Sequence, residues 1–397
     1  MKLIQRNIYL DELKSLIGIP DIKVITGIRR SGKSKLMQAF VEYIQQTEKN
    51  ANVIHINFNL TDFSSLLKSE LLEKYVEEKY KPNANNFLLI DEIQMCDSFE
   101  KAINSLHARE KYDIYITGSN AFLQSSDLAT LFVGRTYEIH IFPFSFKEYI
   151  EYYNTENIYA GFTDYISEGG MAGSFLYKNI EQKYKYINNE VLNALIVRDI
   201  VDKYKLRNVP LLHSLIDYLM DNIGNITSIS DITNAISSSK TKVDHKTINN
   251  YITYLCKSFA FYRIRRYDIK GKRYLRSEDK FYLSDHSFRY ARLGTKNADY
   301  GRVLENIVAI ELLRRGYEIY VGVLYKTEID FVAIKQGEKI YIQVAYDISE
   351  PKTFEREVKS LLKIKDAYTK IVLARTYQPR FQYEGIQIID IESWLIE

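Results

Sequence analysis

Apolar runs and helically spaced apolar residues alternate along the first part of the chain. The run 23–26 predicts a short buried strand, and apolar residues then recur at helical spacing over 36–43. The runs 87–90 and 113–117 predict two more strands. Buried strands that alternate with helices are typical of an α/β fold built on a parallel sheet.

The pattern becomes helical after Pro143. Ser145 is the predicted N-cap of the first helix, because Glu148 follows three residues later as in a capping box. Helical segments continue to residues 203–204. Three further helices are predicted to begin at Leu211, Ser230 and Asp244.

Two strands follow these three helices. Residues 259–266 and 273–283 are the predicted strands, joined at Lys270-Gly271. Three helices followed by a two-stranded wing have the shape of a winged helix.

Residues 300–397 carry a separate pattern. It predicts a helix that ends near Gly316, a strand at 317–321 and a hairpin formed by 328–332 and 339–345. Two more strands are predicted at 370–374 and 385–390, followed by a last helical turn around Trp394.

Composition limits the class of protein. A chain of 397 residues is long enough for about two to four domains. The net charge of +3 is too small to establish a nucleic-acid partner. The two cysteines, Cys96 and Cys256, lie far apart without C-x-x-C spacing, which favours neither a disulfide framework nor a zinc site.

The apolar runs and the N-terminus also predict the cellular location. The N-terminus lacks the apolar core of a signal peptide, and no apolar run approaches the roughly 20 residues that span a bilayer. We therefore expect a soluble cytoplasmic protein without a membrane partner.

The segment between the first strand and the first helix fits G-x-x-x-x-G-K-[ST]. Glycines let successive backbone N–H groups face one anion, and the N-terminus of the helix adds partial positive charge. Lys33 is expected to reach the β- and γ-phosphates of ATP, and the Ser34 hydroxyl to bind Mg²⁺. The residues expected to contact the nucleotide are Gly27, Ile28, Arg29, Arg30, Ser31, Gly32, Lys33, Ser34 and Lys35.

Two carboxylates end the strand 87–90. Strands of a parallel sheet present their C-terminal residues at the edge where ligands bind. Asp91 is therefore the second expected Mg²⁺ ligand, and Glu92 is expected to orient and polarise the attacking water.

Several motifs together resemble the AAA-type ATPases that carry a C-terminal restriction-endonuclease-like domain. They are G-I-R-R-S-G-K-S at 27–34, L-L-I-D-E-I-Q at 88–94, T-G-S-N-A-F-L at 117–123, L-F-V-G-R at 131–135 and I-F-P-F-S-F-K-E at 141–148. They occur in the family's order along nearly the whole chain.

The resemblance implies roles for two further residues. Asn120 corresponds to a sensor of the γ-phosphate, and Arg135 to an arginine finger, which in this superfamily usually acts on a neighbouring subunit. A homo-oligomer is therefore one expectation. The alternatives are a turn-forming Asn120 and a surface ion pair of Arg135.

Two other positions fit the family less well. Residues 169–173 lie where the family has G-G-x-P, but Ala172 stands in place of the proline. Arg198 is a candidate second sensor, with an ion pair on a helix face as the alternative.

The predicted winged helix is the most basic part of the chain. Such a surface suits the phosphates of DNA, and the alternative is packing on the ATPase domain or on a protein partner. The residues concerned are Lys246, Arg263, Arg265, Arg266, Lys270, Lys272, Arg273 and Arg276.

The last third resembles the PD-(D/E)xK nuclease fold. Glu305 and Asp330 match two acids of that site, but the (D/E)-x-K position reads Gln343-Val344-Ala345. A neutral amide binds metal weakly and Ala345 cannot activate water, so the resemblance implies a degenerate nuclease domain.

These expectations combine into three parts. Residues 1–205 form an AAA-type ATPase with a helical lid, 206–285 a winged helix and 286–397 the nuclease-like domain. The favoured function is Mg²⁺-dependent ATP hydrolysis that repositions the two C-terminal modules. The alternatives are a nucleotide-gated interaction switch with negligible turnover and a DNA nuclease powered by ATP.

Overall fold

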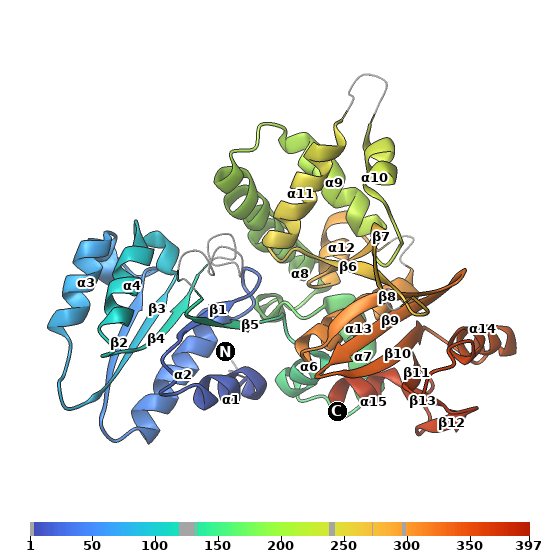
Figure 1. The fold of residues 1–397 in the computed structure, drawn as a ribbon, viewed down its shortest axis with the longest axis horizontal. Coiled ribbons are helices and arrows are strands. Elements are labelled where there is room, and N and C mark those ends of the chain that lie inside the picture. The colour runs from blue at the N-terminus through green and yellow to red at the C-terminus, as the bar shows by residue number, and fades with distance from the viewer. Residues whose placement is uncertain (1–3, 119–131, 133, 238–242, 272, 296–298) are drawn as a thin grey trace. The chain divides into compact units, whose positions relative to one another are not determined.

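The computed structural model describes residues 4–118, 132, 134–237, 243–271, 273–295 and 299–397. The chain divides into two compact units, Met1–Ile141 and Phe142–Glu397 (Figure 1). The first unit is an α/β layer structure, and the second combines helices with a larger sheet.

A parallel sheet forms the centre of the first unit. Its strand order is β2-β3-β4-β1-β5 within the described residues, and every paired neighbour runs parallel. This confirms the α/β fold with a parallel sheet that the apolar pattern predicts. The strands are β1 (Ile22–Thr26), β2 (Ala51–Asn57), β3 (Asn85–Asp91), β4 (Asp113–Thr117) and β5 (Thr136–His140).

Helices cover both faces of this sheet (Figure 1). Successive side chains of a strand point to opposite faces, so alternate residues of each strand enter two separate cores. Leu88 and Ile90 of β3 pack with helices α3 (Ser69–Glu78) and α4 (Phe99–Ala108). Phe87 and Leu89 of the same strand pack with α1 (Asn7–Ser15) and α2 (Lys33–Thr47).

The second unit begins with helices. The predicted capping box is confirmed: Glu148 N donates to Ser145 Oγ, and the Glu148 carboxylate accepts from Ser145 N. The elements are α6 (Phe146–Tyr153), α7 (Ile158–Glu168), the 3₁₀ turn η3 (Ala172–Leu176), α8 (Ile180–Tyr186), the π-helical η4 (Ile187–Leu192) and η5 (Leu195–Asp202), α9 (Val209–Asp221), α10 (Ile229–Ile236) and α11 (His245–Lys257).

One large sheet collects the remaining strands of this unit. Its order is β12-β13-β11-β10-β9-β8-β6-β7. The strands are β6 (Phe261–Asp268), β7 (Arg273–Leu283), β8 (Glu318–Leu324), β9 (Thr327–Lys335), β10 (Glu338–Ala345), β11 (Thr369–Ala374), β12 (Phe381–Tyr383) and β13 (Ile386–Asp390). Helices α12 (Ser287–Leu293), α13 (Tyr300–Arg314), α14 (Pro351–Leu362) and α15 (Ile391–Ile396) accompany it.

The predicted wing strands belong to this sheet. They pair with each other as an antiparallel hairpin, and Arg266 of β6 lies in parallel register with Val321 of β8. The strands 261–283 therefore extend the sheet built by residues 318–390. The winged-helix and nuclease-like assignments, with boundaries at 205/206 and 285/286, stay predictions.

The glycine pair 169–170 has a packing role. A Cβ on Gly169 would lie 2.2 Å from Asp285 Oδ1, and a Cβ on Gly170 would lie 2.2 Å from the Phe144 carbonyl oxygen. Gly170 N donates to Asp285 Oδ2 at 2.7 Å. Side chains do not fit in this turn, which joins the end of α7 to the segment after β7.

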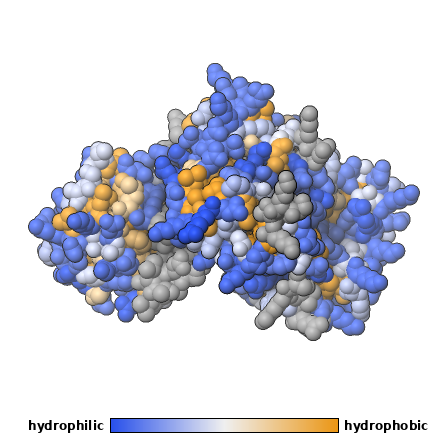
Figure 2. Space-filling view, turned by 90° about the horizontal axis from the view of Figure 1, so that it is seen from above, coloured by the Kyte–Doolittle hydropathy of each residue, from blue (hydrophilic) through white to orange (hydrophobic). Residues whose placement is uncertain are grey.

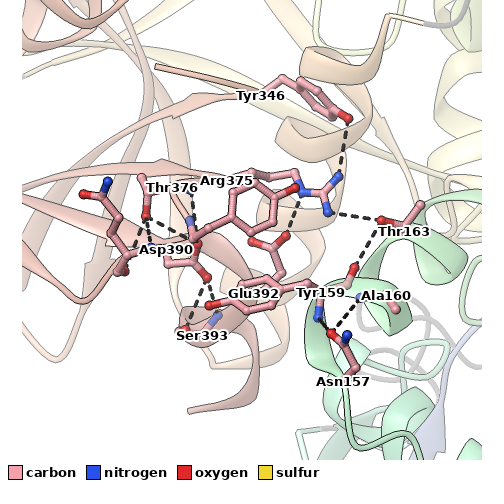
Figure 3. Close-up of polar contacts among 12 residues, drawn as sticks. Asn157, Tyr159, Ala160, Thr163, Tyr346, Arg375, Thr376, Asp390, Glu392 and Ser393 are labelled. Atoms are coloured by element: carbon pink, nitrogen blue, oxygen red, sulfur yellow. Dashed lines mark hydrogen bonds and ion pairs between the residues drawn. The ribbon is translucent and has the colours of Figure 1, made fainter. Parts of the chain in front are cut away.

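A buried arginine joins α7 to the far end of the large sheet (Figure 3). Arg375, which follows β11, donates to Glu392 Oε1 of α15 at 2.7 Å and to Thr163 Oγ1 of α7 at 3.1 Å. Its third contact is the Tyr346 hydroxyl after β10, at 3.3 Å. These bonds connect α7 with three segments that lie between residues 346 and 392.

The face shown in Figure 2 is mostly hydrophilic, with hydrophobic residues in separate patches. Among the described residues, no helix is both long enough and apolar enough to cross a bilayer.

Candidate nucleotide-binding site

The glycine loop lies between β1 and α2, where the sequence predicts it. Gly27 has a φ of 140°, and a Cβ there would lie 2.2 Å from the Ile141 carbonyl oxygen. Gly32 is the left-handed N-cap of α2, with a φ of 100°. Both glycines thus adopt backbone that other residues rarely do, which turns the loop back over the start of the helix.

Lys33 is buried and lies along the loop. Its Nζ donates to the carbonyl oxygens of Gly27 at 2.7 Å and Ile28 at 3.1 Å. Ser34 and Lys35, in the same first turn of α2, have exposed side chains. The cation is therefore inside the loop, where a phosphate would offer stronger acceptors than two carbonyls.

Three buried polar atoms at this edge lack hydrogen-bond partners among the described residues. They are Arg29 Nε, Ser31 Oγ and Asp91 Oδ2. A buried polar atom without a partner is costly, so each is suited to an additional ligand. A carboxylate oxygen with a free lone pair beside a phosphate loop fits a hard cation such as Mg²⁺.

The two acids lie at the C-terminal end of β3 and share one hydroxyl. Thr117 Oγ1, at the end of β4, donates to Asp91 Oδ1 and accepts from Glu92 N at 3.2 Å. Glu92 has left-handed backbone with a φ of 59°, and Gln94 Nε2 donates to its carboxylate. Strain of this kind in a non-glycine residue is concentrated at functional sites.

The sequence does not single out Thr117, although its position at a strand end next to the β3 acids is a usable signal. Strand β4 lies between β1 and β3. The hydroxyl therefore lies between the glycine loop and the acids.

Residues of the edge strand β5 also reach the loop, and the sequence does not predict them. Thr26 Oγ1 donates to Glu138 Oε1 at 2.7 Å and lies 3.0 Å from His140 Nδ1. Loss of solvation, together with the nearby charge of Lys33, lowers the pKa of His140 to about 3. Burial raises the pKa of Glu138. The imidazole beside Lys33 is consequently neutral at pH 7.

Of the two residues assigned from the family resemblance, the structure describes only Arg135. Asn120 lies outside the described residues. Arg135 is exposed and immediately precedes β5, and its carbonyl accepts from Ile22 N at 2.9 Å. Because β1 and β5 are parallel, Arg135 lies at the opposite end of the strands from Gly27, about 20 Å away along six residues.

The candidate basic residues of the second unit lie on different elements. Arg198 is exposed on η5. On the predicted wing, Arg263 pairs with Asp279 at 2.6 Å and Arg266 pairs with Glu278. These ion pairs reduce the positive charge that the wing offers.

The nuclease-like residues do lie together. Glu305 of α13 and Asp330 of β9 surround one side chain, Lys280 of β7. Gln343 Oε1 accepts from Asp330 N at 2.7 Å. Ala345 is buried at the end of β10, in register with Ala374.

Strand, glycine loop, helix and an acid-tipped strand of the same parallel sheet define a P-loop nucleotide-binding domain. Residues 20–150 match the family model described as an AAA domain. Residues 159–299 match a model described as a domain of unknown function, DUF8612. An AAA-type fold implies nucleotide binding and hydrolysis.

Two relatives align along most of their length. A protein of Haemophilus influenzae, described as uncharacterized, is 35% identical over 401 residues, which cover all of this chain and 99% of the relative. The uncharacterized protein MJ1544 of Methanocaldococcus jannaschii is 31% identical, over 87% of this chain and 79% of the relative. The chain belongs to the family of these two proteins.

Solved structures that align with part of this chain include replication initiators. AMPPCP-bound DnaA from Aquifex aeolicus aligns with a TM-score of 0.33 and 19% identity, over 65% of this chain and 90% of that chain. DnaA bound to AMPPCP and single-stranded DNA aligns with a TM-score of 0.31 and 19% identity, over 65% and 89%.

Proposed function

We propose that the chain is a Mg²⁺-dependent ATPase whose nucleotide cycle in residues 1–141 repositions modules of residues 142–397. The observation that carries the proposal is the contact of Thr117 with both Asp91 and Glu92, one strand away from the glycine loop. One hydroxyl thereby fixes a candidate metal ligand and a candidate base at the edge where the phosphates would bind.

The loop residues supply the binding part of the mechanism. Backbone N–H groups of the loop and of the first turn of α2 would surround the β-phosphate. Lys33 Nζ would exchange the Gly27 and Ile28 carbonyl oxygens for phosphate oxygens. Ser34 and Asp91 would hold Mg²⁺, which neutralises phosphate charge when bound.

Glu92 is the proposed base. Its carboxylate follows directly on Asp91, and its backbone N–H is held by Thr117. Gln94 contacts one carboxylate oxygen, so the other is the one available to polarise water. Asn120 as γ-phosphate sensor and Arg135 as finger complete the proposal from the resemblance.

A nucleotide-gated switch with negligible turnover is the second candidate. Two observations favour it: Lys33 is occupied by loop carbonyls, and Arg135 lies at the opposite end of β5 from the loop of its own chain. A chain that binds ATP without a second subunit would then change state but hydrolyse slowly.

Phosphate release by purified wild type and by Lys33→Ala, Glu92→Gln and Lys49→Ala tests the proposal. We expect Lys33→Ala to lose ATP binding and turnover. Glu92→Gln should keep ATP affinity within about threefold and lower turnover about 100-fold or more, because a general base is lost. Lys49→Ala changes an exposed lysine beyond the end of α2 and should behave as wild type.

The outcomes separate the candidates. Wild-type turnover in Lys33→Ala or Glu92→Gln contradicts the ATPase mechanism. Negligible turnover of the wild type at every protein concentration, together with ATP binding that depends on Lys33, supports the switch instead.

A further inference from the structure

Three carboxylates meet in the second unit, far from the nucleotide site in sequence. Glu305 comes from the first half of α13, and Glu328 and Asp330 come from one face of β9. Asp330 Oδ2 accepts from Val344 N of the neighbouring strand β10 at 2.9 Å. The nuclease resemblance implies a divalent metal among such acids.

A lysine occupies the space between these acids. Lys280 Nζ lies 2.6 Å from Glu305 Oε1, 2.6 Å from Glu328 Oε1 and 3.7 Å from Asp330 Oδ1. The side chain is 3% exposed, and the Tyr282 hydroxyl donates to the same Glu305 oxygen. The ammonium thus stands at the point that a metal bound by these carboxylates would need.

The remaining polar groups of the site are also occupied. Gln343 Oε1 accepts from Asp330 N, and its amide donates to Glu357 Oε2 at 2.8 Å. The residues present do not fit the implied metal.

Five basic and five acidic side chains line the cleft at these acids, and among them Arg302 pairs with Asp299 and Arg356 with Glu357. The cleft encloses about 650 Å³. Helix α14 contributes Arg356, Lys359 and the adjoining Lys363 at helical spacing of three and four, so they share one side of the helix. Lys326, in the turn between β8 and β9, lines the same cleft. Among the ion pairs between described residues, those of the cleft lining involve neither Lys326 nor Lys359.

We propose that this cleft binds the phosphodiester backbone of a nucleic acid without a divalent metal and without cleaving it. Lys280 offsets part of the negative charge of the acidic floor, and a phosphate that enters the cleft meets Lys326, Lys359 and Lys363. No water-activating metal enters the centre, because an ammonium already fills it. The proposal goes beyond the ATPase function and does not depend on it.

Fluorescence anisotropy with a labelled 20-mer, as single strand and as duplex, tests the proposal in EDTA without ATP. We expect binding to at least one of the two forms by wild type and by Lys33→Ala. Lys326→Glu/Lys359→Glu should weaken it at least tenfold at low salt and flatten the slope of log K against log salt by about 2. The double variant Lys246→Glu/Arg265→Glu reverses the same charge on the predicted wing and should bind as wild type.

A second arm examines the lysine. Lys280→Met should lose affinity in EDTA and regain it when Mn²⁺ is added, because the freed carboxylates then hold a cation. Wild type should be indifferent to Mn²⁺ and leave supercoiled plasmid intact. Circular dichroism and thermal unfolding verify that each variant is folded. Lys326→Glu/Lys359→Glu tests the proposal without altering the buried cluster around Lys280.

Three results would overturn it. The first is that neither nucleic-acid form binds at low salt. The second is that Lys246→Glu/Arg265→Glu loses as much affinity as Lys326→Glu/Lys359→Glu. The third is that binding or nicking by the wild type depends on Mn²⁺.

Discussion

A single hydroxyl group, that of Thr117, contacts both acidic residues of the nucleotide site. It donates to Asp91 and accepts from the Glu92 backbone, whose left-handed conformation it holds in place. A threonine is suited to this because one oxygen donates and accepts at once. The consequence is that the metal ligand and the base are positioned together.

We expect Thr117→Val to fold and to hydrolyse ATP at least tenfold more slowly. Valine keeps the shape of the side chain but leaves a buried carboxylate oxygen and a backbone N–H without their shared partner. Steady-state phosphate release measures the effect, and Thr47→Val, on the exposed end of α2, is the matched control. Unchanged turnover in Thr117→Val would show that the contact does not position Glu92.

His140 is the second informative residue. Its imidazole contacts Thr26 and lies near Lys33, and its pKa is lowered to about 3. In the unfolded chain a histidine binds a proton near pH 6.5. Between these two values the unfolded state therefore binds more protons than the folded state, and stability rises with pH.

The expected result is acid sensitivity that depends on His140. On going from pH 7 to pH 5, wild type should lose up to about 2 kcal/mol more unfolding free energy than His140→Gln, since each pKa unit corresponds to about 1.4 kcal/mol. Denaturant unfolding at the two pH values measures it. His245→Gln, which changes an exposed imidazole, should retain the wild-type dependence. Parallel curves for wild type and His140→Gln would contradict the prediction.

At the scale of elements, long-range polar contacts join segments that local patterns leave separate. Arg375 connects β11, α15 and α7 (Figure 3), and Asp285 connects the turn after α7 to the segment after β7. Glu392 is fully buried and its Oε2 has no partner among the described residues. Arg375 is therefore the main counter-ion of this buried carboxylate.

Removal of that arginine should destabilise the second unit. We expect Arg375→Ala to cost about 3 kcal/mol or more, because it leaves a buried carboxylate without its counter-ion. Arg380→Ala breaks an exposed pair with Glu397 and should cost less than about 1 kcal/mol. Urea unfolding of both variants measures the difference. Similar losses in the two would mean that Glu392 is neutral in the folded protein.

At the scale of the whole molecule, the parallel sheet separates Arg135 from the glycine loop of its own chain. Thr136 is in register with Ile22, whereas the loop begins after Thr26. Arg135 can therefore act as an arginine finger only on the nucleotide of another chain, and that chain must bind next to the N-terminal end of β5.

Mixing two inactive variants tests this requirement. Arg135→Ala and Lys33→Ala should each be slow alone, and together they should recover a measurable fraction of turnover, because some interfaces combine an intact loop with an intact finger. Wild-type turnover per chain should rise with protein concentration. An Arg135→Ala chain with wild-type turnover, or a rate per chain independent of concentration in an active wild type, would remove Arg135 from the mechanism.

The sequence by itself determined some of the local elements, whereas helices such as α14 were not predicted. Strand, glycine loop and helix at 22–47 depend on residues close together in the chain, so their periodicity and the two glycines suffice to predict them. The same holds for the helix, hairpin and strands after residue 300, each of which the apolar pattern places within a few residues of its observed bounds. The capping box at Ser145 is likewise a local signal.

Only the tertiary structure decided which distant residues meet. Lys280 lies among Glu305, Glu328 and Asp330 because β7 joins the large sheet through β6 and β8, a pairing that no periodicity encodes. For the same reason Thr117 contacts the β3 acids, and Arg135 lies away from the loop. Local patterns specify what each segment becomes, whereas strand order and register specify its neighbours, and the chemistry of both sites depends on those neighbours.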